Sequence, residues 1–126
     1  MVKSISLVLF ATLLATGGQL LLKTGLDQLS ATQGSGVSSW ELLSQAIHNP
    51  IVVGGLATYA VSAMVYILGL ARLDVSIAFP LVGLSYALVP LGAWLLLGET
   101  VPPLRWLGVL VTCMGVALVT WTATLN

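Results

Sequence analysis

The stretch VSIAFPLVGLSYALVPLGAWLLLG, residues 75–98, runs for 24 residues without a charged side chain. A helix of about 20 apolar residues crosses the ~30 Å hydrocarbon core of a bilayer, so this stretch predicts a membrane-spanning helix. Two prolines and the glycine that lies between them interrupt it, although a plain spanning helix does better without them. Because proline lacks a backbone donor and kinks helices, we expect a bent span with helix-kink positions at Pro80, Gly83 and Pro90.

The bend has two interpretations. Pro80 follows the start of the span closely and disturbs few turns, so Pro90 is the better candidate for a true kink. In a carrier, such a span is a deformable wall whose bend changes as access alternates between the two sides of the membrane. A static kink that only shapes the helix bundle explains the same residues.

The rest of the chain has the same apolar character. Hydrophobic residues make up 58% of the chain and charged residues 6%, against roughly 25% charged in an ordinary soluble domain. Four uncharged stretches of 19 or more residues lie between the charges. We therefore predict an all-α integral membrane protein, a single domain over residues 1–126, with both termini on one side. Its four transmembrane helices are expected at about residues 4–23, 50–71, 75–98 and 103–124.

The long connection between the first two spans, residues 27–49, contains a Ser/Gly-rich stretch that predicts a flexible loop. It continues as SSWELLSQAIHNP, in which Ser38 or Ser39 is an N-cap candidate. The apolar side chains that share one face of this short helix are Trp40, Leu43 and Ile47. We interpret it as an interfacial helix with its tryptophan at headgroup depth, the alternative being an ordered loop without membrane contact.

Several functional classes are disfavoured by composition. The net charge is zero and no basic run occurs, so the chain has no electrostatic footprint for nucleic acid. Cys113 is the single cysteine and no Cys/His cluster has the spacing of metal ligands, so we expect neither a metal nor another cofactor. No catalytic motif is present, and an enzyme is not expected.

Neutral polar side chains lie inside the predicted spans, whereas no ionisable side chain lies near the centre of any span. Tyr59, Ser62 and Tyr66 fall at i, i+3 and i+7, which puts them on one face of the second span. That face is a candidate lining for a polar path, together with Gln19, Ser85 and Tyr86. Hydrogen bonding between helices, or anchoring of a tyrosine at the interface, is the alternative.

Charged residues gather at one membrane face, because Lys23 closes the first span, Glu99 closes the third and Arg105 opens the fourth. An ion pair between Lys23 and Glu99, with Arg105 near it, would suit an anionic lipid headgroup. Charges that merely end their helices and reach for water are the alternative.

Two glycines seven residues apart, Gly108 and Gly115, lie on nearly the same side of the fourth span and leave room for another helix. They predict a dimer interface, although a contact within one chain would look the same. The Gly17–Gly18 and Gly54–Gly55 pairs similarly permit close backbone packing.

Membrane orientation is not settled by the positive charges. One side of the membrane receives Lys3 and Arg72, and the other receives Lys23 and Arg105, so the count ties at two against two. Either the chain inserts both ways up, or a feature other than this count sets its orientation.

Three segments together resemble the small four-span branch of the drug/metabolite transporter superfamily. They are GGQLLLK at 17–23, LDVSIAFPLVGLSYALVPLGAWLLLGE at 73–99 and PPLRWLGVLVTCMGV at 102–116. Within that branch they are most similar to the subunits of the flippase for aminoarabinose linked to undecaprenyl phosphate and to EamA-type half-transporters. The related small multidrug resistance proteins carry a glutamate eight residues before the lysine, where this chain has Ala15.

The resemblance implies a transporter in a bacterial inner membrane that flips a polyprenyl-phosphate-linked sugar or a similar lipid-linked metabolite as a homodimer or heterodimer. In that case Lys23 would meet the lipid phosphate and Glu99 would hold or neutralise Lys23. From polarity alone, we expect Gln19, Tyr59, Tyr66 and Tyr86 to face the sugar. Two alternatives remain open: an exporter of small cationic or neutral metabolites, and a non-transporting subunit of a lipid-modifying complex.

Overall fold

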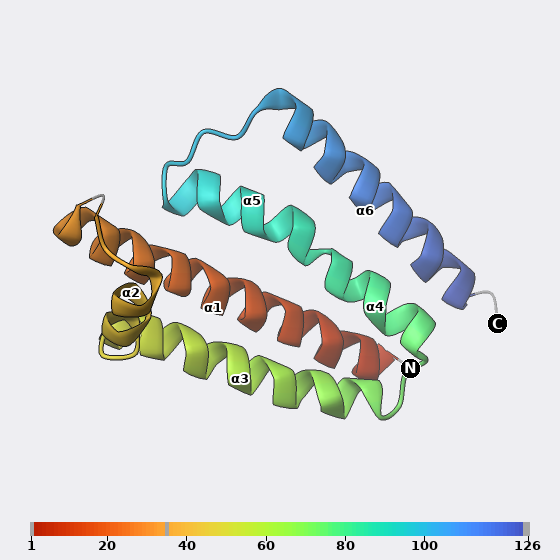
Figure 1. Cartoon of the computed structure of the whole chain (residues 1–126). Helices are drawn as coiled ribbons and strands as arrows, with labels where there is room; N and C mark the ends of the chain where they lie inside the picture. The colour runs from red at the N-terminus through yellow and green to blue at the C-terminus, as the bar shows by residue number, and fades with distance from the viewer. Residues whose placement is uncertain (1, 35, 125–126) are drawn as a thin grey trace.

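The computed structural model describes residues 2–34 and 36–124, which form helices joined by short connections and contain no strand (Figure 1). The elements are α1 (Val2–Gln33), α2 (Ser39–Ala46), α3 (Pro50–Leu70), α4 (Val75–Gly83), α5 (Ser85–Leu96) and α6 (Pro103–Thr124). Four helical stretches are long and apolar enough to cross a membrane: Val2–Gln33, Pro50–Leu70, Val75–Leu96 and Pro103–Thr122. The chain is therefore an integral membrane protein with the predicted all-α architecture.

The spans alternate in direction, and the start of α1 lies at the same end as the finish of α6 (Figure 1). The closest packing is between α1 and α3, while α6 packs against α4 and α5. Most large apolar side chains are exposed, for example Met64, Leu95 and Leu118. In a soluble protein, so much exposed apolar surface would be unfavourable. Here these faces contact lipid tails, which are as apolar as leucine.

Helix α1 is longer than predicted. It continues to Gln33, so the expected start of the loop at Asp27 is wrong. The side chains of Lys23 and Asp27 form an i,i+4 ion pair at 2.8 Å, and such pairs support a helix. The helix ends before Gly34, whose φ of +71° is a left-handed conformation that favours glycine.

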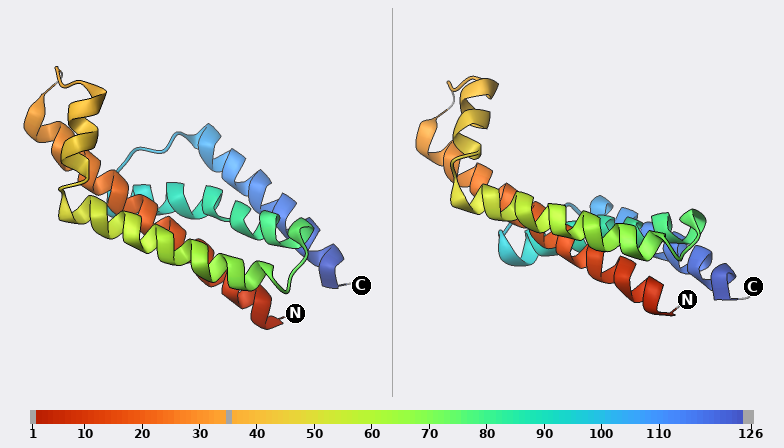
Figure 2. Two further views of the ribbon diagram at one scale, coloured as in Figure 1. Left: turned by 60° about the horizontal axis from the view of Figure 1, so that its bottom comes forward. Right: turned by 90° about the horizontal axis from the view of Figure 1, so that it is seen from below.

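Helix α2 begins where the sequence suggested. Ser38 is its N-cap and forms a capping box with Glu41, in which each side chain accepts the backbone N–H of the other residue. The predicted apolar face is exposed, with Trp40 at 76%, Leu43 at 55% and Ile47 at 56%. Figure 2 shows α2 running across the ends of α1 and α3 instead of along them.

The third span is divided into α4 and α5 by a turn at Leu84. The N–H of Leu84 donates to the carbonyl of Leu81 at 3.2 Å, three residues back, instead of to Pro80, so the last turn of α4 is tightened. The division falls six residues before Pro90, the position that the sequence favoured for a kink, and Pro90 lies inside α5. Pro80 lies inside α4.

At the end opposite α2, a small core holds α1 to the beginning of α4. Its buried members are Val8, Leu73, Ala78 and Leu81. Leu73 comes from the short turn between α3 and α4, and Tyr66 of α3 packs against the cluster. This end of the bundle is therefore held together by apolar side chains.

Candidate functional site

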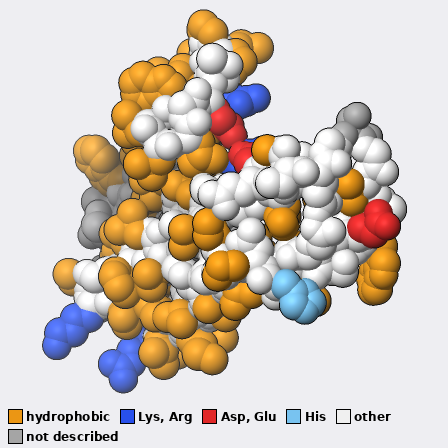
Figure 3. Space-filling view, turned by 90° about the vertical axis from the view of Figure 1, so that its left-hand side faces the viewer, with side chains coloured by type: hydrophobic (Ala, Val, Ile, Leu, Met, Phe, Trp, Pro, Cys, Tyr) orange, Lys and Arg blue, Asp and Glu red, His pale blue; other side chains and the backbone are white. Residues whose placement is uncertain are grey.

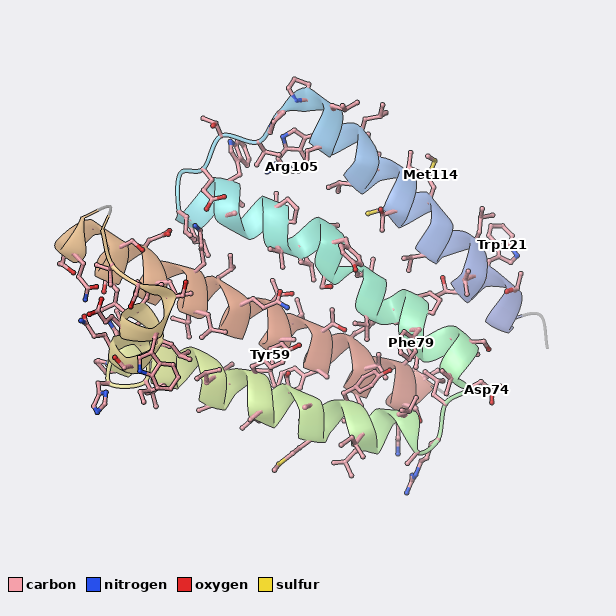
Figure 4. The ribbon with its side chains drawn as sticks, viewed as in Figure 1. Tyr59, Asp74, Phe79, Arg105, Met114 and Trp121 are labelled. Carbon is pink, nitrogen blue, oxygen red and sulfur yellow. The ribbon has the colours of Figure 1, made fainter. Side chains whose placement is uncertain are left out.

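A cavity of about 250 Å³ lies between α1, α3, α4 and the beginning of α5. Its walls are Ala11, Thr12, Ala15, Gln19, Tyr59, Ser62, Ala63, Tyr66, Phe79, Val82 and Ser85. In Figure 4, Tyr59 lies between α1 and α3, and Phe79 belongs to α4. The alanines leave the space open because they lack the bulk of the surrounding leucines and valines.

The position of this cavity depends on two glycines. A Cβ added to Gly18 would lie 2.8 Å from the carbonyl oxygen of Gly55, and one added to Gly55 would lie 2.9 Å from the carbonyl oxygen of Gly18. The backbones of α1 and α3 therefore meet here without side chains between them. The neighbouring Gly17 and Gly54 have nothing within 4 Å of an added Cβ. Gln19 follows Gly18 in the chain, and the backbone N of Tyr59 would lie 3.1 Å from a Cβ added to Gly18, so this contact sets both residues on the cavity walls.

The structure brings together five of the neutral polar residues that the sequence singled out. Tyr59, Ser62 and Tyr66 share a wall, as their spacing predicted, and Gln19 and Ser85 face the same cavity. Ser62 is buried and its hydroxyl donates to the carbonyl of Tyr59 at 2.6 Å. The side chains of Gln19, Tyr66 and Ser85 form no hydrogen bond within the part of the chain that the structure describes, so they are available to a ligand. Their role in binding stays a prediction.

A second cavity of about 300 Å³ shares Gln19 and Ser85 with the first. Tyr86, Val89 and Pro90 complete its lining. Tyr86 is 72% exposed, so it borders this space from the outer side and does not reach the first cavity with the other tyrosines. Since Pro90 has no N–H, the carbonyl of Tyr86 lacks its usual helical partner. Together, the two cavities extend beside α1 from α4 into α5.

The cavity wall of α1 continues into a charged cluster. Ala11, Ala15 and Gln19 are spaced by four residues along α1, and Lys23 and Asp27 are the next two members of the same row. A row of i,i+4 positions forms a ridge inclined to the helix axis. The α1 residues that line the cavity and the charged residues at the end of the span therefore lie on one continuous ridge of the helix.

Lys23 has two acidic neighbours. Its Nζ lies 2.8 Å from Oδ1 of Asp27 and 3.9 Å from Oε1 of Glu99. The predicted pair with Glu99 is thus present, and its role toward a substrate stays a prediction. Asp27 was missed because it was assigned to a loop, although its i,i+4 spacing from Lys23 was readable. All three side chains are partly exposed, and Figure 3 shows acidic and basic side chains gathered at this end.

Glu99 is held by the connection that follows α5. Gly98 has a φ of +67°, a left-handed conformation, and the N–H of Glu99 then donates to the carbonyl of Ala93 at 3.1 Å. Arg105 lies at the beginning of α6, at the same end of the molecule (Figure 4). It forms no ion pair with the residues that the structure describes.

Gly108 and Gly115 of α6 are exposed, and an added Cβ at either would meet nothing within 4 Å. They take no part in packing among the described residues. That excludes the alternative in which both serve a close helix contact inside the chain, and it leaves their use in a dimer as a prediction.

No group of three or more His, Cys, Asp or Glu side chains suited to a metal ion occurs between residues 2 and 34 or 36 and 124. The lining of both cavities contains no Asp, Glu, Lys or Arg side chain. The site is therefore a neutral polar recess between helices, followed along α1 by a cluster of charges.

Comparison with known proteins gives one consistent result. The EamA-like transporter family matches residues 38–121. A protein of Shewanella sediminis named 4-amino-4-deoxy-L-arabinose-phosphoundecaprenol flippase subunit ArnF is 36% identical, over 94% of this chain and 88% of the relative. The corresponding ArnF of Serratia proteamaculans is 33% identical, over 86% and 85%. A subunit named ArnE from Salmonella newport is 30% identical, over 89% and 92%.

No solved structure matches the chain. The family match covers more than half of the sequence, and the similarity to the named relatives runs through nearly all of it. Four spans, a neutral polar cavity between them and this similarity lead to one assignment: the chain belongs to the EamA-like transporter family.

Proposed function

We propose that this chain is a subunit of a flippase that moves a sugar carried on a polyprenyl phosphate across the bacterial inner membrane. The observation that carries the proposal is the 36% identity to a flippase subunit over 94% of the chain. The relatives named above act, by their names, on an aminoarabinose linked to phosphoundecaprenol. The substrate of this chain is moved without chemical change.

The cavities fit the sugar and not the lipid tail. Their volumes of about 250 and 300 Å³ lie at or below the lower limit of ordinary small-molecule pockets, roughly 300–1,000 Å³. A long polyprenyl chain exceeds that space, whereas the exposed apolar sides of the spans offer it a bilayer-facing surface. The tail therefore stays in the lipid while the sugar passes between the helices.

Different polar groups bind the phosphate and the sugar of the headgroup. Lys23 meets the phosphate, and Glu99 holds or neutralises Lys23 when no substrate is present. Gln19, Tyr59, Tyr66 and Ser85 face the sugar, with the more exposed Tyr86 at the border of the second cavity. Free hydroxyl and amide groups next to aromatic rings suit a sugar, which offers both hydroxyls and C–H faces.

Small multidrug exporters are the nearest alternative, and Ala15 argues against that function. It lines the first cavity at the position where those proteins carry a glutamate. An apolar methyl group cannot bind a proton or pair with a cationic drug. Proton-driven uptake of a quaternary ammonium compound into vesicles containing this protein would instead support the exporter function.

The chain works as part of a dimer in this proposal. Helix α6 exposes Gly108 and Gly115 to the outside of the bundle, where the backbone of another span can approach closely. The relatives are named as subunits of two kinds, ArnE and ArnF. The partner is either a second copy of this chain or a similar four-span subunit.

The proposal is tested with purified protein in proteoliposomes that contain an undecaprenyl-phosphate-linked amino sugar in both leaflets. After the outer amines are blocked with a membrane-impermeant reagent, flipping is measured as the return of reactive amines to the outer leaflet. We expect Lys23→Ala to slow flipping about tenfold or more, since the variant loses a charge-assisted hydrogen bond from the ammonium group to the phosphate, worth about 1.5–3 kcal/mol. Lys3→Ala, at the opposite end, is the matched control.

Flipping by Lys23→Ala at the wild-type rate would contradict the proposed phosphate role. If the wild-type protein moves no amino sugar either alone or with a related subunit, the chain is a non-transporting membrane subunit and the flippase proposal fails. Insertion and folding of each variant are checked first by circular dichroism and size-exclusion chromatography.

A further inference from the structure

Lys23 is bound unequally to its two acidic neighbours. The 2.8 Å separation from Asp27 is a charge-assisted hydrogen bond. The 3.9 Å separation from Glu99 is an ion pair without a hydrogen bond, because donor and acceptor are too far apart. One contact is firm and the other is loose.

The two acidic residues also belong to different parts of the fold. Asp27 lies on α1, four residues after Lys23, and moves with it as one rigid unit. Glu99 lies beyond α5, on the connection that leads to α6. The Lys23–Glu99 pair therefore joins α1 to the connection between α5 and α6, whereas the Lys23–Asp27 pair joins two turns of one helix. Among the described residues, it is the only ion pair that links α1 to another part of the chain.

The part of the molecule that Glu99 belongs to is attached to α1 less firmly than α3 is. The α1–α3 contact is backbone to backbone at Gly18 and Gly55. The second cavity lies between α1 and α5, and the first is bounded by α1, α3, α4 and the beginning of α5. At the other end of these cavities, the apolar core around Val8 joins α1 to α4. At the Lys23 end, α5 contacts α1 through Gly92, where an added Cβ would lie 2.5 Å from the flexible side chain of Leu20, and the loose ion pair lies beyond this contact.

We propose that Lys23 and Glu99 form a latch over the cavities, that Asp27 positions Lys23, and that the anionic headgroup of the substrate opens the latch by displacing Glu99. This inference rests on the proposed function, and it adds the mechanism by which the substrate gains entry. Glu99 occupies one side of the Lys23 ammonium group, so a phosphate reaches that side only when Glu99 moves away. Binding of the phosphate and opening of the helices are then one event.

Partial exposure suits this task. Ion pairs that water reaches contribute little to stability and exchange readily, so a phosphate can compete for the ammonium group. Asp27 keeps that group in place during the exchange, because their hydrogen bond lies within one helix and does not depend on how α5 moves. Without Asp27, the ammonium group is free to approach Glu99 more closely, and the latch tightens.

The latch is tested by measuring distances between spin labels at Gln28 and Thr100, both exposed, after each is changed to cysteine in a Cys113→Ala chain. The probe is undecaprenyl phosphate in liposomes, and undecaprenol without phosphate is the control. We expect Glu99→Gln to raise the fraction of longer distances about two- to fivefold with no lipid added, since an exposed ion pair contributes little free energy. Undecaprenyl phosphate should shift the wild-type distances the same way, and undecaprenol should not.

Asp27 is tested by titrating the same opening with undecaprenyl phosphate. Asp27→Asn should raise the concentration at half-opening about tenfold, equivalent to one unit of log Kd, and Asp27→Glu should restore it. Asp74→Asn, at the other end of the molecule, is the matched control and should have no effect. An unchanged half-opening concentration in Asp27→Asn would overturn the positioning role.

The experiment separates this inference from the proposed function. If Glu99→Gln leaves the distances unchanged, the latch is wrong whatever the substrate is. If Glu99→Gln opens the helices but undecaprenyl phosphate does not, a substrate-opened latch is wrong and the failure lies with the proposed substrate class.

Discussion

Gly18 and Gly55 hold α1 and α3 at a separation that admits no side chain. An added methyl group at Gly18 would meet backbone atoms of Gly55 and Tyr59 at 2.8 and 3.1 Å, and backbone cannot move aside as a flexible side chain can. We expect Gly18→Ala and Gly55→Ala each to destabilise the protein by about 1–3 kcal/mol, as overpacking does. The measurement is the free energy of unfolding in mixed detergent micelles.

The neighbours of these glycines supply matched controls. Gly17→Ala and Gly54→Ala add the same methyl group where nothing lies within 4 Å. In a helix, alanine is about 1 kcal/mol more favourable than glycine, so these variants should be neutral or slightly stabilised. Equal losses at all four positions would show that close α1–α3 contact at Gly18 and Gly55 is not the cause.

These glycines also show how far single residues are predictable. The sequence marked both glycine pairs as places of close packing, but it could not say which member of each pair faces the other helix. Adjacent helical residues point about 100° apart, and only the partner helix decides between them. The Lys23–Glu99 pair was found because both residues end spans, whereas Asp27 was hidden by the assumption of a flexible loop.

Helix α2 exposes an apolar face close in the chain to exposed apolar residues of α3. Ile47 lies three residues before the start of α3, where Val53 and Leu56 are likewise exposed. We expect this face to lie at headgroup depth, because a tryptophan with neighbouring apolar side chains partitions there. Spin labels at Leu43→Cys should collide with oxygen several times more often than labels at Gln45→Cys, both in a Cys113→Ala chain. Gln45 is exposed on the opposite side of the same helix. Equal, water-like accessibility at both positions would show an ordered connection without membrane contact.

Among the elements, the predictable features are those with strong local signals. Ser38 was recognised as an N-cap candidate and the spans were recognised from their lack of charge. The division of the third span was only partly predictable. Pro80 and Pro90 predicted an irregular helix, but the turn that divides it lies at Leu84, between them. Each proline removes one helical hydrogen bond and so makes the helix easier to distort. Packing decides at which residue the distortion occurs. Here it occurs beside Gly83, which lies close to Val116 of α6.

The order and direction of the four spans followed from the sequence because charged residues separate the uncharged stretches and successive spans cross the membrane in opposite directions. The cavity was anticipated only as a set of polar residues. Its volume depends on Ala11, Ala15 and Ala63, which carry no polar signal, and on how closely α1 approaches α3. Tyr86 shows the limit of reasoning from polarity, since its side chain is largely exposed although its immediate neighbour Ser85 faces the first cavity.

The two ends of the molecule carry equal numbers of positive residues, so these charges favour neither orientation in the membrane. Arg105 and Asp74 lie at opposite ends in Figure 4, and the positive residues divide two against two between those ends. Since positive charge near a span favours the cytoplasmic side, one added lysine should decide a balanced chain. We expect Thr100→Lys and Ala71→Lys, both at exposed positions, to shift the orientation in opposite directions. The readout is labelling of Gln28→Cys by a membrane-impermeant thiol reagent applied to spheroplasts, in a Cys113→Ala chain.

Thr100→Lys should lower the labelled fraction, because it draws the end that carries residue 28 to the cytoplasmic side, and Ala71→Lys should raise it. Thr100→Gln and Ala71→Gln add length without charge and should leave the fraction unchanged. If neither lysine moves the labelling, the balance of charges does not control insertion. If both lysines move it, the native chain is poised between orientations, and a dimer of identical chains has access to an antiparallel arrangement in which each membrane face receives one Lys23–Glu99 latch.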